Sequence, residues 1–194
     1  MRREPLVRAI EIIPYDERWP EEFAGIAAEL RHALGALAVR LDHIGSTSVP
    51  GLAAKDIIDV QLAVASLAPD LPLSAALATA GYTPVQGIVS DHRPPGATGP
   101  DADWEKRFYQ PPPGQRPTNL HVRVGGRQNW RYALLFRDYL RAHPQAAGAY
   151  AELKRRLAAY HGADRDTYTE IKDPACNIVF AAAEEWASVT RWRP

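Results

Sequence analysis

The segment from Ile57 to Val64 constrains the fold most, because it is the most continuously apolar strand-like stretch of the chain. Such a composition is typical of a strand inside a sheet, so it predicts a central strand. Leu37 to Ile44 alternates apolar and polar residues and predicts a half-buried strand just before it. Thr118 to Val124 alternates in the same way and predicts a further strand. The middle of the chain therefore forms a sheet.

Helical patterns lie on both sides of these strands. Apolar residues spaced three and four apart predict a helix over Asp16 to Gly35, and a shorter helix is expected over Leu71 to Ala80. The C-terminal third predicts helices over Arg127 to Ala142 and Pro144 to Tyr160. Thr167 and Glu170 have the spacing of a capping box, which marks the start of a third helix there. Ile10 to Ile13 is expected to form a brief strand or a lead-in, and short strands are expected at Tyr82 to Val85 and Glu105 to Gln110.

The order of these elements predicts the fold class. Strands in the middle, with helices at both ends, indicate an α+β (or α/β) protein that forms a single domain over residues 1–194. Seven of the 17 prolines fall between Pro94 and Pro117, so residues 87–117 are expected to be mostly a long loop. In the second C-terminal helix, Tyr150, Leu153, Leu157 and Tyr160 would share one face. That arrangement leaves Lys154, Arg155 and Arg156 for solvent or an anion.

Charge and cysteine content narrow the function classes. The formal net charge is zero, so global charge gives no support to nucleic-acid binding. The single cysteine, Cys176, cannot form an internal disulfide, and no segment reaches the roughly 20 apolar residues of a membrane span. We therefore expect a cytoplasmic protein that does not bind membranes. Only four of the 23 basic residues are lysines, an excess of arginine that either phosphate recognition or codon bias would produce.

Several common cofactor motifs are absent. The sequence contains neither G-x-x-x-x-G-K-[ST] nor G-x-G-x-x-G, which argues against a P-loop kinase and a Rossmann dehydrogenase. His43 and His121 have no second ligand at zinc spacing, so each is either beside a site or a buried histidine with an ordinary hydrogen bond. We expect no zinc, haem or flavin.

A Gly-Ser turn is the strongest candidate for a binding site. Gly45 and Ser46 directly follow one expected strand, and Asp59 lies on the next. Amide groups in such a turn can bind an anion, and Lys55 can add a positive charge to the same phosphate. The alternative is an ordinary turn with Lys55 in solvent.

The residues around this turn carry a family resemblance. The stretch from His43 to Asp59 (HIGSTSVPGLAAKDIID) is similar to the signature of the GrpB family. Leu120-His121-Val122 resembles the family's third core-strand motif. Phe136 to Arg141, with Tyr150, Lys154, Tyr168 and Lys172, resembles its helical C-terminal half. The similarity covers roughly residues 10–186, and residues 94–103 look like an addition.

The resemblance implies a fold, a metal site and a partner. Members of this family belong by fold to the nucleotidyltransferase superfamily, which implies a mixed sheet flanked by helices. In some bacteria, GrpB-like domains are attached to dephospho-CoA kinase. Superfamily enzymes place two carboxylates two residues apart on the strand after Gly-Ser, with a third acid on a later strand, to hold two divalent ions.

This chain departs from that metal-binding pattern. Asp59 matches the first acid, but the second position is Gln61, and Asp56 would face the other side of the strand. On the later strand, His121 and Arg123 share a face and neither is an acid. Asp59 could still bind Mg²⁺ that arrives with a nucleotide. Alternatively, it accepts hydrogen bonds from the Gly45-Ser46 loop or pairs with Lys55 or Arg123.

Two functional hypotheses follow. In the first, a nucleotidyltransferase-like enzyme binds phosphate through Gly45 and Ser46 and Mg²⁺ through Asp59, while Lys55 or Arg123 neutralises developing charge. In the second, the chain binds a nucleotide or other phosphorylated small molecule without transfer, or acts as an accessory module for a partner enzyme. Further residues on the phosphate or base side are His121, Arg123, Arg137 and Lys172; each of the last three could instead form a surface ion pair.

Overall fold

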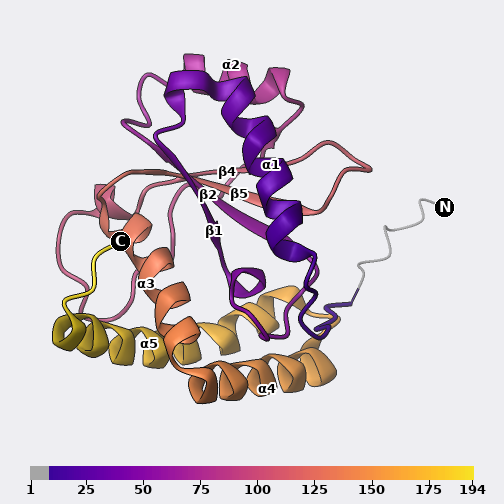
Figure 1. Cartoon of the computed structure of the whole chain (residues 1–194), viewed down its shortest axis with the longest axis vertical. Helices are drawn as coiled ribbons and strands as arrows, with labels where there is room; N and C mark the ends of the chain where they lie inside the picture. Colours follow the sequence, from indigo (N-terminus) through magenta and orange to yellow (C-terminus); the bar gives the residue numbers. More distant parts are fainter. Residues whose placement is uncertain (1–8) are drawn as a thin grey trace.

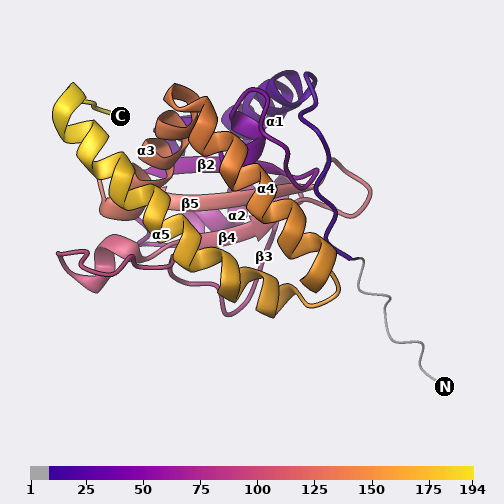
Figure 2. The same ribbon diagram turned by 90° about the horizontal axis from the view of Figure 1, so that it is seen from below.

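A computed structural model describes residues 9–194, in which a five-stranded mixed sheet lies between two layers of helices (Figures 1 and 2). The strands are β1 (Arg40–Ile44), β2 (Ile58–Val64), β3 (Thr83–Pro84), β4 (Arg107–Gln110) and β5 (Thr118–Val124). Their order is β1-β2-β5-β4-β3, and only β2 and β5 are parallel. The segment predicted to be a central strand is therefore paired on both sides.

Helices cover both faces of the sheet. They are α1 (Trp19–Leu34), α2 (Leu71–Thr79), α3 (Gln128–Ala142), α4 (Pro144–His161) and α5 (Arg165–Thr190). Helices α1 and α2 lie on one side, and α3, α4 and α5 lie on the other, as the view in Figure 2 shows. The α+β class with a helical C-terminal portion is thus confirmed. No helix in residues 9–194 combines the length and the apolar character needed to cross a membrane.

The two faces of the inner strands differ in chemistry. Alternate residues such as Ile58, Val60 and Leu120 pack with Trp19 and Leu30 of α1 in the main hydrophobic core. The residues between them on β2 and β5 point to the opposite face. That face carries the polar side chains Asp59, Gln61, Asn119, His121 and Arg123. Polar groups are thereby placed between the sheet and the layer of α3, α4 and α5.

Several expected elements differ from the structure in their extent or their starting residue. Residues 10–13 form only an isolated bridge between Ile13 and Ala54, and the strand expected at residues 82–85 has two residues. The last helix begins at Arg165 rather than at Thr167, because the Asp164 side chain accepts hydrogen bonds from the amides of Asp166 and Thr167 at 3.1 and 3.0 Å. Aspartate is a strong N-cap, so the capping box at Thr167 does not form.

The face of α4 also differs from the prediction. Tyr150 and Leu157 are buried as expected, but Tyr160 is 81% exposed. Lys154, which the pattern left for solvent or an anion, is only 4% exposed. The reason is geometric: Lys154 follows Tyr150 by four residues and so lies on the same face of the helix.

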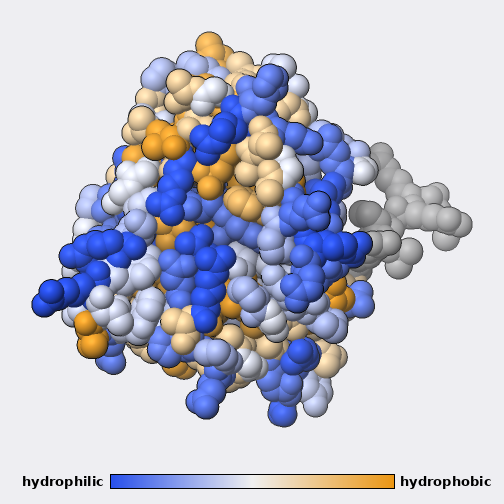
Figure 3. Space-filling view, viewed as in Figure 1, coloured by the Kyte–Doolittle hydropathy of each residue, from blue (hydrophilic) through white to orange (hydrophobic). Residues whose placement is uncertain are grey.

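The proline-rich segment is more ordered than a simple loop. Residues 87–117 include β4 and a 3₁₀ turn at Asp101–Trp104, and Ser90 forms a bridge with Glu105. The Asp91 amide donates to the Trp104 carbonyl at 2.8 Å, which holds the two arms of the segment together. This pairing fixes Asp91 next to the sheet. The surface seen in Figure 3 is mainly hydrophilic, with hydrophobic residues in small separate groups.

Candidate functional site

The floor of the candidate site is the polar face of β2 and β5. Asp59 lies opposite Asn119 in the parallel register, and Gln61 lies opposite His121. The Asp59 Oδ1 atom accepts a hydrogen bond from Asn119 Nδ2 at 2.8 Å and lies 3.6 Å from His121 Nε2. Burial raises the pKa of Asp59, but His121, Asn119 and His43 outweigh burial and lower it overall. Asp59 is therefore an ionised acceptor.

The Gly45-Ser46 turn lies directly against this carboxylate. Gly45 has a φ of +68°, and a Cβ atom there would lie 2.3 Å from Asp59 Oδ2. Only glycine tolerates both the backbone conformation and the close approach. Residues 46–48 then form a short 3₁₀ turn. The turn and Asp59 thus face one another, as the sequence motif predicts.

Two lysines lie beside the turn without a carboxylate partner. Lys154 Nζ donates to Ser46 Oγ at 2.8 Å and to the Ala53 carbonyl at 2.5 Å. Lys55 Nζ lies 4.2 Å from the centroid of the Tyr168 ring. Burial lowers the pKa of Lys154 to about 7 and that of Lys55 to about 8. Within residues 9–194 neither lysine forms an ion pair, so both positive charges are uncompensated.

An opposite arrangement surrounds Asp91. Its carboxylate accepts hydrogen bonds from Arg123 at 2.8 and 2.9 Å, from Lys106 at 2.8 Å and from Asn129 at 3.0 Å. Arg123 also donates to Gln61 Oε1 at 2.6 Å. Burial raises the pKa of Asp91, but Arg123 and Lys106 lower it far more. Each charged group of this network is therefore paired within the protein.

The same network determines the state of His121. Its Nδ1 atom lies 3.5 Å from Lys106 Nζ and 3.4 Å from an Arg123 nitrogen, which are both donors. Nδ1 must therefore be the acceptor, and the ring proton lies on Nε2, facing Asp59. Burial lowers the pKa of His121 to about 4. His121 is a neutral donor to Asp59 rather than a base.

All four lysines of the chain line a single cavity of about 510 Å³. Lys106 pairs with Asp91, and Lys172 pairs with Asp173 at 3.1 Å. Lys55 and Lys154 complete the set. Scattered surface lysines would not converge in this way in a chain whose other basic residues are arginines. The fold therefore brings all four amines to one place.

The cavity continues into a smaller volume of about 280 Å³. Gly45, Asp59 and His121 line both parts, so the two are contiguous. Its lining is mixed: charged residues that include Asp91, Arg123 and Asp173 share it with aromatic side chains of α3 and α4. They include Tyr132, Phe136 and Tyr150, together with Cys176 of α5.

The structure does not bring every predicted residue to the site. Gly45, Ser46, Lys55, Asp59, His121 and Lys172 all line the larger cavity. Arg123 lies at the smaller one but is bound to Asp91 and Gln61. Arg137 lines neither part: it donates to the His43 carbonyl at 3.0 Å and to Asp138 at 2.7 Å, which ties α3 to β1. Asp59 pairs with neither Lys55 nor Arg123, because Asn119 and His121 are its partners.

The sequence analysis did not name Asp91, Lys106 or Asn119 as site residues, and it assigned Lys154 to solvent or an anion. Asn119 was detectable, because it precedes His121 by two residues on the same strand and so shares its face. The scarcity of lysine was a signal for Lys106 and Lys154. Nothing local in the sequence distinguishes Asp91.

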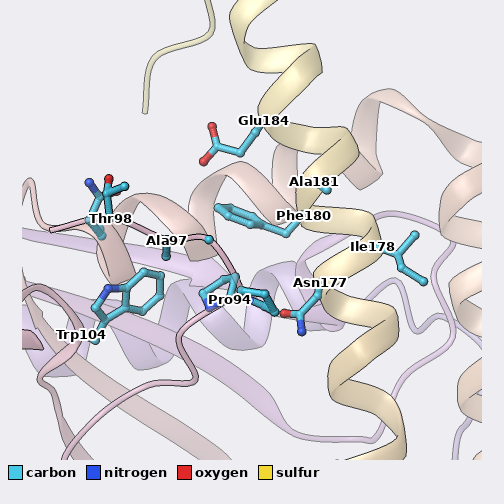
Figure 4. Close-up of a pocket in the computed structure, with 12 residues that line it drawn as sticks. Pro94, Ala97, Thr98, Trp104, Asn177, Ile178, Phe180, Ala181 and Glu184 are labelled. Atoms are coloured by element: carbon cyan, nitrogen blue, oxygen red, sulfur yellow. The ribbon is translucent and has the colours of Figure 1, made fainter.

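A separate cavity of about 560 Å³ lies between the proline-rich segment and α5 (Figure 4). Its walls include Pro94, Trp104 and Phe180, and its one acidic side chain, Glu184, pairs with Arg131. It lacks the convergent polar groups of the lysine-lined cavity. We therefore place the candidate site at the sheet.

The donor set does not form a resident metal centre. Residues 9–194 contain no group of three His, Cys, Asp or Glu side chains arranged to hold an ion. Where a second acid would lie, Gln61 is fully buried and bound to the Arg123 guanidinium. A fixed cation thus lies next to the position at which a second metal ligand is expected.

Comparisons with known proteins agree with the observed fold. The family model described as GrpB protein matches residues 9–181. A crystal structure of conserved protein GrpB from Enterococcus faecalis superposes with a TM-score of 0.74 at 30% sequence identity and covers 91% of this chain and 99% of that one.

Curated relatives are of two kinds. A dephospho-CoA kinase of Mycolicibacterium paratuberculosis is 38% identical over 95% of this chain and 48% of its own length. The UPF0157 protein PA4798 of Pseudomonas aeruginosa is 38% identical over 84% of this chain and 63% of its own length. The chain therefore spans about half the length of the kinase relatives it matches.

Proposed function

This chain belongs to the GrpB family, and we propose that its lysine-lined cavity binds a nucleotide or another phosphorylated small molecule without transferring a nucleotidyl group. The observation that carries the proposal is the pair of uncompensated lysines at the Gly45-Ser46 turn. Lys55 and Lys154 approach a space bordered by the Ser46 hydroxyl, and neither has a carboxylate partner within residues 9–194.

Burial of these amines without an anion is unfavourable. Removing a charged group from water costs several kcal/mol unless an opposite charge compensates. The lowered pKa values of Lys154 and Lys55 reflect this cost. A phosphate group would supply the missing negative charge and accept hydrogen bonds from both amines. An anionic ligand therefore explains the lysines, whereas packing alone does not.

Nucleotidyl transfer has less support. A two-metal mechanism needs carboxylates that hold both ions against the attacking and leaving oxygens. Asp91 and Asp173 are already paired with cations, which leaves Asp59 as the cavity's unpaired carboxylate. We therefore propose that Mg²⁺, where it takes part, arrives with the ligand's phosphates and contacts Asp59. In that case it supplies charge neutralisation alone.

Calorimetric titration with ATP, ADP and AMP, each with and without Mg²⁺, tests the proposal. We expect binding to the wild-type chain that falls at least tenfold in Lys154→Met. Arg156→Met is a matched control, because Arg156 lies on the same helix but is exposed and paired with Glu152. Asp59→Asn should remove the part of the affinity that depends on Mg²⁺. Equal affinity in Lys154→Met and the wild type would refute the proposal, and release of pyrophosphate from ATP would restore the transferase hypothesis.

The relatives favour a second, compatible role. Relatives named dephospho-CoA kinase contain a region similar to nearly the whole of this chain. We propose that the chain can act as an accessory module for a kinase of coenzyme A biosynthesis. Kinase activity measured with and without added chain tests this role. An unchanged rate and an absence of complex in sedimentation would reject it.

A further inference from the structure

We infer that the ligand is a phosphate monoester that carries a planar ring, with its phosphate at the lysines and its ring among the aromatic residues. The inference rests on the proposed function and adds a substrate class to it. The cavity has two regions, a lysine lobe and an aromatic lobe. The lysine lobe is lined by Ser46, Lys55, Lys154 and Tyr168, and the aromatic lobe by Tyr132, Phe136 and Cys176.

Charge in the lysine lobe favours a monoester over a diester. The terminal phosphate of a monoester carries about −1.5 to −2 charges near pH 7, whereas a diester carries about −1. Lys55 and Lys154 provide two amines that no carboxylate neutralises within residues 9–194. Lys154 already uses two of its N–H donors on Ser46 and Ala53, and its third is available to a ligand. A dianion matches both amines, and a monoanion leaves one of them buried and unmatched.

The aromatic lobe suits a flat ring with polar edges, because Asp91, Arg123 and Asp173 line it together with the aromatic residues. Tyr132 and Phe136 lie nearly parallel with ring centroids 6.0 Å apart, and Phe136 meets Tyr150 edge to face at 5.6 Å. Aromatic walls of this kind favour a ring, which stacks or packs edge to face against them. Tyr150 lines both lobes, so the lobes adjoin and one ligand can occupy both.

Asp59 lies where the two lobes meet and disfavours phosphate at that point. It lines both parts of the cavity and is ionised, with Asn119 as a donor to Oδ1. An ionised carboxylate accepts hydrogen bonds and repels a second anion. A hydroxyl-bearing linker between phosphate and ring, such as a sugar, fits this position. The order of groups in the ligand follows: phosphate, hydroxylated linker, ring.

Four probes separate the contributions of phosphate and ring. Calorimetric titrations without metal compare AMP, adenosine 3′,5′-cyclic monophosphate, adenosine and inorganic phosphate. We expect AMP to bind at least tenfold more tightly than each of the other three. Lys55→Met and Lys154→Met should each weaken AMP at least tenfold. Phe136→Leu should weaken AMP about fivefold and leave inorganic phosphate unchanged, while Arg156→Met should change neither.

Each contrary outcome has a distinct meaning. Cyclic monophosphate that binds as tightly as AMP would overturn the monoester assignment, and inorganic phosphate as tight as AMP would overturn the ring. A Phe136→Leu variant that weakens both AMP and phosphate equally would also remove the aromatic lobe from the inference. In these three cases a dependence on Lys154 would leave the proposed function standing. Failure of every phosphorylated probe to bind would overturn the inference and the proposed function together.

Discussion

The two ends of the central cavity contain the same kinds of charged side chain and use them in opposite ways. At one end, Asp91 is bound by Arg123, Lys106 and Asn129, so each charge has a partner inside the protein. At the other end, Lys55 and Lys154 form no ion pair among residues 9–194, and their direct contacts are the Tyr168 ring, the Ser46 hydroxyl and the Ala53 carbonyl. The comparison teaches that burial alone does not identify a functional charge. We propose that the absence of an internal counter-charge does, because a ligand of opposite charge would stabilise such a group.

The largest loss of stability is expected at the end of the cavity that contains Asp91, where the charges are paired. Asp91→Ala leaves Arg123 and Lys106 buried without their carboxylate, and breaking such a network costs about 3 kcal/mol or more. Scanning calorimetry should show a Tm lower by roughly 6–12 °C. Asp101→Ala is the control, because Asp101 lies in the same segment and pairs with Arg93 but is fully exposed. Equal shifts in the two variants would show that the Asp91 network does not stabilise the fold.

Gly45 lies against Asp59, between the two ends of the cavity, and its substitution should give the next largest loss of stability. Gly45→Ala combines a positive φ with a Cβ placed 2.3 Å from Asp59 Oδ2, so we expect a loss of about 2–4 kcal/mol in unfolding free energy. Gly126→Ala has a φ of +85° but open space around the new Cβ, and it isolates the backbone strain at about 1–2 kcal/mol. Urea unfolding of both variants measures the difference. A loss no greater than that of Gly126→Ala would mean that the turn does not press on Asp59.

At the end of the cavity that contains Lys55 and Lys154, removal of a charge should not reduce the stability of the fold. Lys154→Met removes a buried amine that has no ion-pair partner, and the apolar replacement has a similar length. We expect the unfolding free energy at pH 7 to stay constant or to rise by about 1 kcal/mol, while AMP affinity falls at least tenfold. Urea unfolding and calorimetry on the same sample check both. A clear loss of stability, with affinity retained, would make Lys154 a structural residue like Lys106.

The smallest expected effect is a pH dependence that distinguishes the two ends. Lys154 has a folded-state pKa of about 7, below its ordinary value of 10.5, so above pH 7 the unfolded chain binds more protons. The cost of burying this amine is therefore fully present below about pH 7 and declines as the pH rises toward 10.5. Urea unfolding at pH 7 and 8 should show the stability advantage of Lys154→Met shrinking by about 1 kcal/mol. A constant difference would show that the amine stays protonated throughout. AMP affinity of the wild type should weaken over the same range.

Sequence patterns predicted the strands and helices well where the period of the pattern extended over many residues. β1, β2 and β5, together with the helices, lie close to their expected ranges, because side-chain alternation and helical spacing are local properties. The errors lie where local signals competed. At the start of α5, Asp164 replaces Thr167 as the N-cap. On α4, Lys154 takes the buried position that the pattern assigned to Tyr160.

The sequence by itself determined the central motif of the site. A turn that requires glycine, followed at a fixed distance by a strand with Asp59, forms the same geometry wherever the two strands pair side by side. It also determined that Gln61 carries no charge, which excludes a complete set of metal-binding acids on that strand.

Only the tertiary structure decided which charges are free. Asp91 meets Arg123 across 32 residues, and Lys154 reaches Ser46 across 108 residues, so no local pattern contains either contact. Whether a buried charge is neutralised depends on which distant side chains the packing of sheet and helices brings within hydrogen-bond distance. That packing closed the Asp91 network and left Lys55 and Lys154 without an ion-pair partner in residues 9–194.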